Sequence, residues 1–190
     1  MSASNGEIDA DASEDLESIL DDCLAIGMPQ EHLLWHYRSR HESLIAFSNR
    51  HFYENKLLTV PSPFERKSSV KWHPVEGYYD RGKTKQNRSE AAAVVEEIKR
   101  RLRSPGLRQY SIGVVTFNAV QQTLIEDLLE SAFRQEPSLE EAALQMKEPI
   151  FVKNLENVQG DERDVILFSI GYGPDQTGKV VLNFGPLNRD

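Results

Sequence analysis

The 190-residue sequence has little cysteine and no long apolar run. Its single cysteine, Cys23, excludes an internal disulfide and is typical of a reducing compartment. Without a cysteine cluster, and with five scattered histidines, no metal site is expected. No apolar run approaches the roughly 18 residues that span a bilayer, and the start lacks the basic and apolar regions of a signal peptide. We therefore expect an intracellular, cytoplasmic protein without a membrane partner.

Two nucleotide-binding patterns are also missing. The sequence has no G-x-x-x-x-G-K-[ST] phosphate loop and no D-E-x-x pair for Mg²⁺. Gly82, Lys83 and Thr84 lack both the upstream glycine and the preceding strand of a phosphate loop. On its own, the chain is therefore not expected to hydrolyse a nucleoside triphosphate.

Charge is unevenly distributed along the chain. The formal net charge is −8, yet residues 1–22 contain eight acidic residues and no lysine or arginine. The remainder has 22 acidic and 22 basic residues. Net charge acts mainly on long-range steering, so nucleic-acid binding stays open. We expect residues 1–12 to be a disordered acidic leader and residues 13–190 to form one domain.

Apolar periodicity predicts strands that alternate with helices. Such alternation indicates an α/β fold with a mainly parallel sheet. The Asn87 side chain, with Glu90 three residues later, gives a capping-box signal for one helix. Segment 134–148 is rich in glutamate and is expected to be a helix or insertion on the surface. The predicted strands are 32–37 (buried), 57–60, 70–75, 111–117, 150–152, 165–170 and 179–184, and the other predicted helices begin at residues 13, 41 and 118.

The stretch from Pro149 to Tyr172 carries the strongest functional signal. Two apolar strands flank a polar loop that shows no apolar periodicity. In this loop Gln159 offers a donor and an acceptor, Gly160 permits a positive φ, and Glu162 can accept hydrogen bonds from sugar hydroxyls. A solvated turn between two strands is the alternative interpretation.

The stretch VKNLENVQGDERDVILFS resembles motif V of superfamily 1 helicases, in the branch of the nonsense-mediated-decay helicase and senataxin. That branch has the pattern V-D-x-F-Q-G-x-E-x-D-x-I-I-L-S. Gln159, Gly160, Glu162 and Asp164 stand at the matching places, while Asn154 replaces the usual Thr.

Two further stretches resemble the same family. HYRSRHESLIAFSNRHFYENKL is similar to Q-Y-R-M-H-P followed by an amphipathic helix and F-Y-x-x-x-L, with Arg38 at the arginine and His36 at the glutamine. SIGVVTFNAVQQ is similar to I-G-V-I-T-P-Y-x-x-Q, with Thr116 at the threonine. The family's next motif, L-N-V-A-x-T-R-A-R, is missing after residue 188.

This resemblance implies a three-layer RecA-like (P-loop NTPase-type) domain. It covers roughly residues 13–188 and implies the second such domain of an ATP-dependent DNA or RNA helicase, truncated before motif VI. The implied cofactors are ATP and Mg²⁺ in the longer parent protein. The implied partners are single-stranded DNA or RNA and the parent's first RecA-like domain. The fragment alone is expected to be inactive.

The resemblance also implies roles for individual residues. Arg38 is the catalytic residue that reaches the γ-phosphate. Glu162, Gln159 and Gly160 are the cofactor-binding residues. Glu162 holds the ribose, and Gln159 and Gly160 shape the loop that carries Glu162. Two residues face the nucleic-acid phosphates, namely Thr116 and Asn154.

Other interpretations remain open at the level of sequence. The chain can be a non-catalytic nucleic-acid-binding or protein-interaction module that kept the fold. It can also be a nuclease in which Asp161, Glu162 and Asp164 bind Mg²⁺, although no nearby lysine is expected to complete that site. Separately, the basic segment 81–88 offers phosphate contacts that depend on salt.

Overall fold

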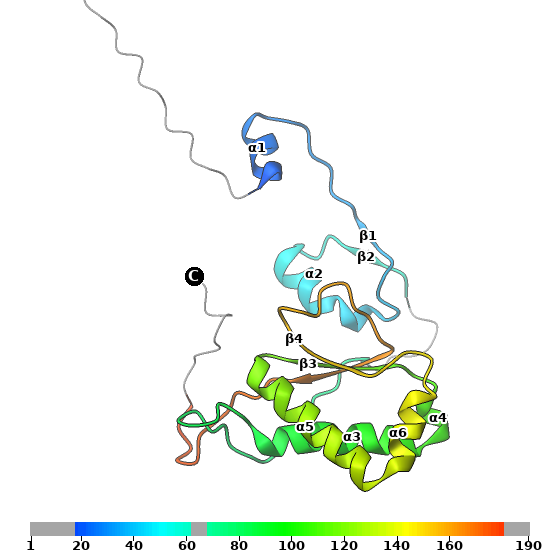
Figure 1. Ribbon diagram of the computed structural model, residues 1–190. Coiled ribbons are helices and arrows are strands. Elements are labelled where there is room, and N and C mark those ends of the chain that lie inside the picture. The colour runs from blue at the N-terminus through cyan, green and yellow to red at the C-terminus, as the bar shows by residue number, and fades with distance from the viewer. Residues whose placement is uncertain (1–17, 62–67, 181–190) are drawn as a thin grey trace, which may run out of the picture. The chain divides into compact units, whose positions relative to one another are not determined.

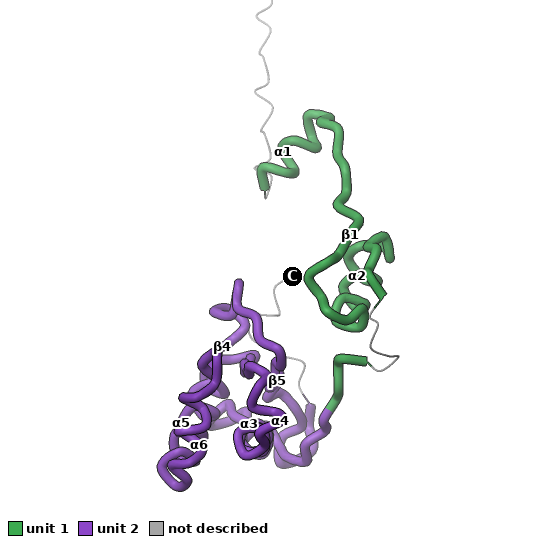
Figure 2. The backbone as a smooth tube through the Cα atoms, turned by 90° about the vertical axis from the view of Figure 1, so that its right-hand side faces the viewer, with its two compact units in different colours: residues 1–72 green, residues 73–190 purple. Residues whose placement is uncertain are grey.

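The computed structural model describes residues 18–61 and 68–180 and divides the chain into two compact units (Figure 2). The first unit is Met1–Trp72 and the second is His73–Asp190. The expected acidic leader, residues 1–12, lies outside the described residues. Within the described ranges, no helix has the length and apolar character needed to cross a membrane.

Three parallel strands form the sheet of the second unit, in the order β4–β3–β5. They are β3 (Ile112–Thr116), β4 (Phe151–Asn154) and β5 (Val165–Ser169). The central strand β3 is buried at every position, which explains its almost wholly apolar sequence. The predicted α/β fold with a parallel sheet is thereby confirmed.

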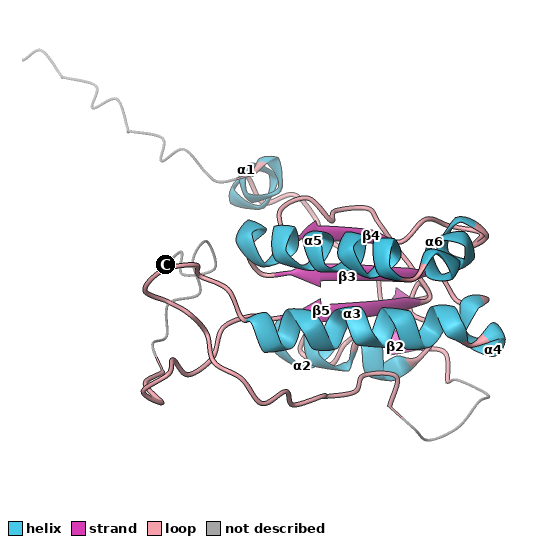
Figure 3. Cartoon of the chain, turned by 60° about the horizontal axis from the view of Figure 1, so that its bottom comes forward, coloured by secondary structure: helices cyan, strands magenta, loops and turns pink. Residues whose placement is uncertain are grey.

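Helices cover one face of this sheet (Figures 1 and 3). The helices are α3 (Arg88–Arg103), α4 (Pro105–Arg108), α5 (Ala119–Gln135) and α6 (Pro137–Leu144). Apolar residues recur at helical spacing on α3 and α5, so each helix turns one stripe toward the sheet. The buried core consists of Ala91, Val95, Ile98, Leu102, Ile112, Val114, Leu124, Ile125, Leu129, Ala132, Leu139 and Ala142.

Helix α6 corrects the expectation that segment 134–148 lies on the surface. The helix forms as predicted, but Leu139 and Ala142 are buried and belong to the core. Their spacing of three residues places both side chains on one side of the helix. The glutamates of the segment masked this short apolar stripe in the sequence.

A glycine on β3 makes room for an aromatic ring. Gly113 and Phe151 are register partners, and a Cβ built at Gly113 would lie 2.3 Å from the Phe151 ring. Side chains alternate along a strand, so this ring lies on the face opposite Ile112 and Val114, which pack in the helical core. Any larger residue at position 113 requires the ring to move.

The first unit contains short elements only. They are α1 (Ile19–Ala25), β1 (Trp35–His36), the 3-10 helix η1 (Glu42–Leu44), α2 (Ala46–Phe52) and β2 (Leu58–Thr59), with β1 and β2 paired in parallel. The predicted helix at 41–53 and the short strand at 57–60 are confirmed with these bounds. The helix expected from residue 13 instead begins at Ile19, because Ser18 is its N-cap with an extended backbone; residues 13–17 lie outside the described residues.

Three strand predictions are wrong or cut short. Segment 32–37 forms only a two-residue strand and is not buried: Leu33 is 91% and Trp35 is 64% exposed. Segment 70–75 forms no strand, and at its first residue the Ser68 hydroxyl engages both the N–H and the C=O of Val70, which a neighbouring strand would otherwise bond. Residues 179 and 180 form no strand because Lys179 closes a turn with Asp175, and the rest of 179–184 lies outside the described residues.

Candidate functional site

The carboxyl ends of the three parallel strands bring polar residues together. Thr116 at the end of β3 is in register with Asn154 on one side and with Ser169 on the other. Such ends are where ligands bind in open α/β sheets. The structure therefore places the two residues predicted to face nucleic acid next to each other, and their role stays a prediction.

The Thr116 side chain is completely buried. Its hydroxyl donates a 2.9 Å hydrogen bond to the Asn118 carbonyl. The Asn118 side chain in turn caps α5, accepting a 2.7 Å bond from the Gln121 backbone N–H. Thr116 thus holds the turn between β3 and α5 rather than pointing into solvent.

Asn154 has an equivalent task at the end of β4. It is 7% exposed, and its side-chain oxygen accepts a 3.1 Å bond from the Asn157 N–H. The next residue, Leu155, donates its N–H to the Thr116 carbonyl at 3.0 Å. The first turn of the loop that follows β4 is therefore fixed to the end of β3.

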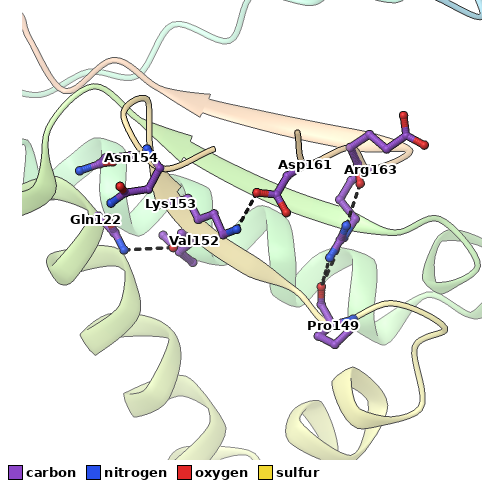
Figure 4. A network of polar contacts seen from close by, with 9 residues as sticks. Gln122, Pro149, Val152, Lys153, Asn154, Asp161 and Arg163 are labelled. Carbon is purple, nitrogen blue, oxygen red and sulfur yellow. Dashed lines mark hydrogen bonds and ion pairs between the residues drawn. The ribbon is translucent and has the colours of Figure 1, made fainter. Parts of the chain in front are cut away.

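The same loop is tied back to β4 along its length (Figure 4). The Lys153 ammonium pairs with the Asp161 carboxylate at 2.6 Å, and the Arg163 guanidinium donates to the Pro149 carbonyl at 3.1 Å. Both cations also lie over the Phe151 ring, at 5.4 Å for Lys153 Nζ and 4.9 Å for Arg163 Cζ. Strand β4 and the residue Pro149 before it therefore position Asp161 and Arg163, which lie near the end of the loop.

Asp164 fixes the far end of the loop to β3. Its carboxylate accepts 3.0 Å bonds from both the N–H and the hydroxyl of Ser111, and its own N–H donates to that hydroxyl at 3.0 Å. The aspartate at the motif's last acidic place thus has a structural task. It sets where β5 begins beside β3.

Between these two anchored ends the loop stays open to solvent. Gln159, Gly160 and Glu162 are all exposed. Gly160 has φ +87°, so the positive φ predicted from the sequence is confirmed. Within the described ranges the Glu162 carboxylate has no hydrogen-bond or ion-pair partner.

This geometry removes the support for a nuclease. Among the described residues, no group of three or more His, Cys, Asp or Glu can hold a metal ion. Asp161 is paired with Lys153, and Asp164 is bonded to Ser111, so the expected carboxylate cluster does not form. The expectation that no lysine lies nearby is also wrong, since Lys153 contacts Asp161 directly.

Arg38 lies in the first unit, two residues after the end of β1. Its side chain is exposed and forms no hydrogen bond or ion pair with any described residue. The turn that carries it is held by His36, whose Nε2 accepts the Ser39 N–H at 3.2 Å and lies 2.7 Å from the Ser39 hydroxyl. A backbone N–H can only donate, so Nε2 is the acceptor and the ring proton is on Nδ1. This gives His36, which stands at the family's glutamine, a defined structural task.

The sequence did not reveal a buried polar network behind the strand ends. Gln121 is completely buried, and its amide bonds both the N–H and the C=O of Asn87, at 2.9 and 3.0 Å. The same amide donates to the Ser169 hydroxyl at 3.2 Å. Gln121 therefore joins the start of α3 to the end of β5. The signal available was its place three residues after the Asn118 cap.

Glu90 completes this network and modifies the predicted capping box. The Asn87 side chain caps α3 as predicted, accepting the Glu90 N–H at 3.1 Å. The Glu90 carboxylate instead turns toward β5, accepting the Ser169 hydroxyl at 2.8 Å and the Gly171 N–H at 3.0 Å. It thereby fixes the backbone where the chain leaves the sheet.

Comparison with known proteins adds an independent finding. The model of a family described as AAA domain matches residues 16–178. An uncharacterized ATP-dependent helicase of Mycoplasma genitalium is 34% identical over 163 residues, which cover 83% of this chain and 14% of the relative. Its homolog in Mycoplasma pneumoniae is 35% identical over the same length, with the same two shares. The chain therefore spans only a small part of the curated relatives that it matches.

Proposed function

The chain belongs to the AAA domain family, a helicase-like P-loop family, and from this premise we propose that it is part of an ATP-dependent DNA or RNA helicase or translocase. Within that class we assign it to superfamily 1, in the branch of the nonsense-mediated-decay helicase and senataxin. Its part is the second RecA-like domain. The motif-V-like loop, the Arg38 stretch and the helicase names of the relatives support this assignment.

The observation that carries the proposal is the loop after β4. It is fixed at one end through Asn154 and at the other through Asp164, yet it leaves Glu162 exposed. A carboxylate in this setting can accept hydrogen bonds from the two hydroxyls of a ribose. We propose that Glu162 holds the ATP ribose while Gln159 and Gly160 shape the loop around it.

Arg38 is our proposed phosphate ligand. Its planar guanidinium fork suits phosphate oxygens, and its side chain is exposed on a turn held by His36. Bound ATP supplies the phosphoryl group that is transferred to water. Arg38 stabilises the charge on that group, as an arginine finger does.

In this proposal the metal ligands and the phosphate loop lie in a different domain of the helicase. The described residues contain no cluster of three or more His, Cys, Asp or Glu that could hold a metal ion. We assign Mg²⁺ binding and the γ-phosphate cradle to a first RecA-like domain in a longer chain. The 190 residues alone then do not hydrolyse ATP.

For nucleic acid, we propose a single strand of DNA or RNA that runs along the carboxyl edge of the sheet. Thr116 and Asn154 lie together at this edge, but their side chains are buried in turns. Their proposed contribution is to fix the backbone of these turns at the edge along which the strand runs.

The test uses the full-length protein that contains these residues. Arg38→Ala should lower ATP turnover stimulated by single-stranded nucleic acid by about 10³-fold, because the charge on the transferred group is no longer stabilised. The matched control is Arg50→Ala, which removes an exposed arginine from the last turn of α2. Steady-state ATPase assays measure both.

Three outcomes would count against the proposal. Equal turnover in the two variants would remove Arg38 from the ATP site. Robust ATP hydrolysis by the purified 190-residue chain would show that the division between two domains is wrong. Nucleic-acid binding by a full-length protein without any ATP turnover would favour the non-catalytic module instead.

A further inference from the structure

Two loops that are far apart in the sequence lie side by side where β5 ends. They are residues 76–88, which end at the first residue of α3, and residues 170–180, after β5 (Figure 1). The Tyr79 N–H donates to the Pro174 carbonyl at 2.9 Å, and the rings of Tyr79 and Tyr172 meet edge to face at 5.3 Å. The Arg81 guanidinium lies 3.9 Å from the Asp175 carboxylate. These contacts join the two loops into one surface.

The tip of the first loop is a closed turn. The Asp80 carboxylate accepts bonds from the Thr84 N–H at 3.2 Å and the Thr84 hydroxyl at 2.9 Å. The backbone closes the same turn, with the Lys85 N–H bonded to the Asp80 carbonyl at 2.7 Å and the Asp80 N–H bonded to the Gln86 carbonyl at 2.9 Å. Lys85 adopts a φ of +55° here. The lysines on the turn are therefore presented from an ordered backbone.

This surface is locally basic in a chain of net charge −8. Residues 76–88 contain four basic and two acidic residues. Lys83 and Lys85 are exposed and form no ion pair within the described part of the chain. Of the acids on the two loops, Asp80 caps the turn and also interacts electrostatically with Lys83, and Asp175 accepts from Thr177 and from the Lys179 N–H. Neither lysine ammonium is held in an ion pair within the described ranges, so both can still reach an anion.

The basic turn lies at the same edge of the sheet as Thr116 and Asn154. Gly171, two residues beyond β5, is bonded to Glu90 in the first turn of α3. The Gln86 amide donates to the Val120 carbonyl at the start of α5 at 3.3 Å. Both contacts attach the two loops to elements at the carboxyl ends of the strands.

We propose that residues 81–88 bind the backbone phosphates of single-stranded nucleic acid, so that the strand's path extends from the sheet edge onto this basic turn. The inference rests on the nucleic-acid role proposed above. Lys83 and Lys85 make the phosphate contacts, and the closed turn holds them toward the strand. These contacts add affinity for any sequence, because phosphates carry no base information.

The experiment measures binding of the 190-residue chain to a fluorescent single-stranded oligonucleotide by anisotropy, over a series of salt concentrations. The test variant is K83Q/K85Q, which removes two charges and keeps side-chain length. The matched control is R134Q/K147Q, which removes two exposed charges at and beyond the C-terminal end of α5. For two lost phosphate contacts the log–log salt slope should fall by about 1.4, with about a tenfold loss of affinity at low salt.

The outcomes separate this inference from the proposed function. A reduced slope in K83Q/K85Q, with R134Q/K147Q like the wild type, supports the basic turn as a phosphate site. Equal binding by both variants and the wild type overturns the inference and leaves the proposed nucleic-acid path intact. Absence of binding by the wild type overturns both. Circular dichroism should show the same folded content in all three proteins.

Discussion

The two units of the chain differ in where they keep their apolar residues. Every buried apolar residue among those described lies in the second unit, between Ala91 and Ala142. No described residue of the first unit is buried, and Leu33, Tyr37 and Phe52 are at least 74% exposed. The second unit therefore holds its own core, whereas the first unit consists of short elements around exposed side chains.

This difference means that the two residues proposed to bind ATP, Glu162 and Arg38, are supported by surroundings of different stability. Glu162 is carried by a loop whose ends are fixed to a buried strand. Arg38 is carried by a turn that depends on one half-buried histidine, His36. Elements with few buried apolar contacts have low local stability and move first. We expect the arginine to be the more mobile of the two.

The largest expected effect tests the core directly. Ile125 in α5 is completely buried, so Ile125→Ala should lower the free energy of unfolding by about 2–5 kcal/mol through lost burial and an added cavity. The counterpart in the first unit is Leu33→Ala, at a side chain that is 91% exposed, with an expected change within about 0.5 kcal/mol. Urea unfolding followed by circular dichroism measures both. Similar losses would break the comparison between the units.

Substitutions of one polar side chain in each unit test the same comparison more finely. Gln121→Leu should cost about 2–4 kcal/mol, because it leaves the buried N–H and C=O of Asn87 without their partner. His36→Ala removes a bond to Ser39 that is only partly buried, with an expected cost of about 1 kcal/mol or less. Thermal unfolding ranks the two. A larger cost at His36 would show that the first unit is held as firmly as the second.

The smallest expected effect depends on pH. The pKa of Glu97 is lowered, first by hydrogen bonds from Arg100 and also by the bond from Arg101. Burial acts in the opposite direction but does not cancel them. A lowered pKa in the folded state adds stability above the pKa of an unfolded glutamate, about 4.3, and this stability is lost as the pH falls through the folded value. At pH 7, Glu97→Gln should therefore cost about 0.5 kcal/mol, discounted for its exposure.

The control for this pH effect is Glu54 of the first unit. Its pKa is also lowered, mainly by a hydrogen bond from Lys56, but it is fully exposed. Because solvent screens its pair with Lys56, Glu54→Gln should destabilise the fold less at pH 7 than Glu97→Gln does. Denaturant melts between pH 3 and pH 7 compare the two variants. A difference at Glu97 that persists at pH 3 would show that the carboxylate charge is not its cause.

The sequence predicted the second unit well, because its signals are local. Asn87 caps a helix with regular apolar spacing, and β3 is an unbroken apolar run between two such helices. Gly160 stands in a polar loop, where its positive φ follows from residue type. Each of these features depends on neighbours within a few residues.

The sequence failed where burial or pairing depends on distant partners. The run at 32–37 contains consecutive apolar residues, as β3 does, but only a partner surface decides whether such residues become buried, and Trp35 stays 64% exposed. The Ser111–Asp164 contact joins residues 53 positions apart, and the Glu90–Gly171 contact joins residues 81 positions apart. No periodicity reports such contacts. The exposed part of the site was therefore easier to anticipate than the buried network behind it.

The missing side chain at position 113 has an evolutionary consequence. Since the Phe151 ring occupies the space of a Cβ there, a residue larger than glycine at position 113 requires the ring to move or position 151 to become smaller. Shrinking position 151 would also remove the platform beneath Lys153 and Arg163. A glycine on one strand thus makes room for the aromatic ring over which two positive charges of the next strand and its loop lie, so substitutions at position 113 reach those charges through Phe151.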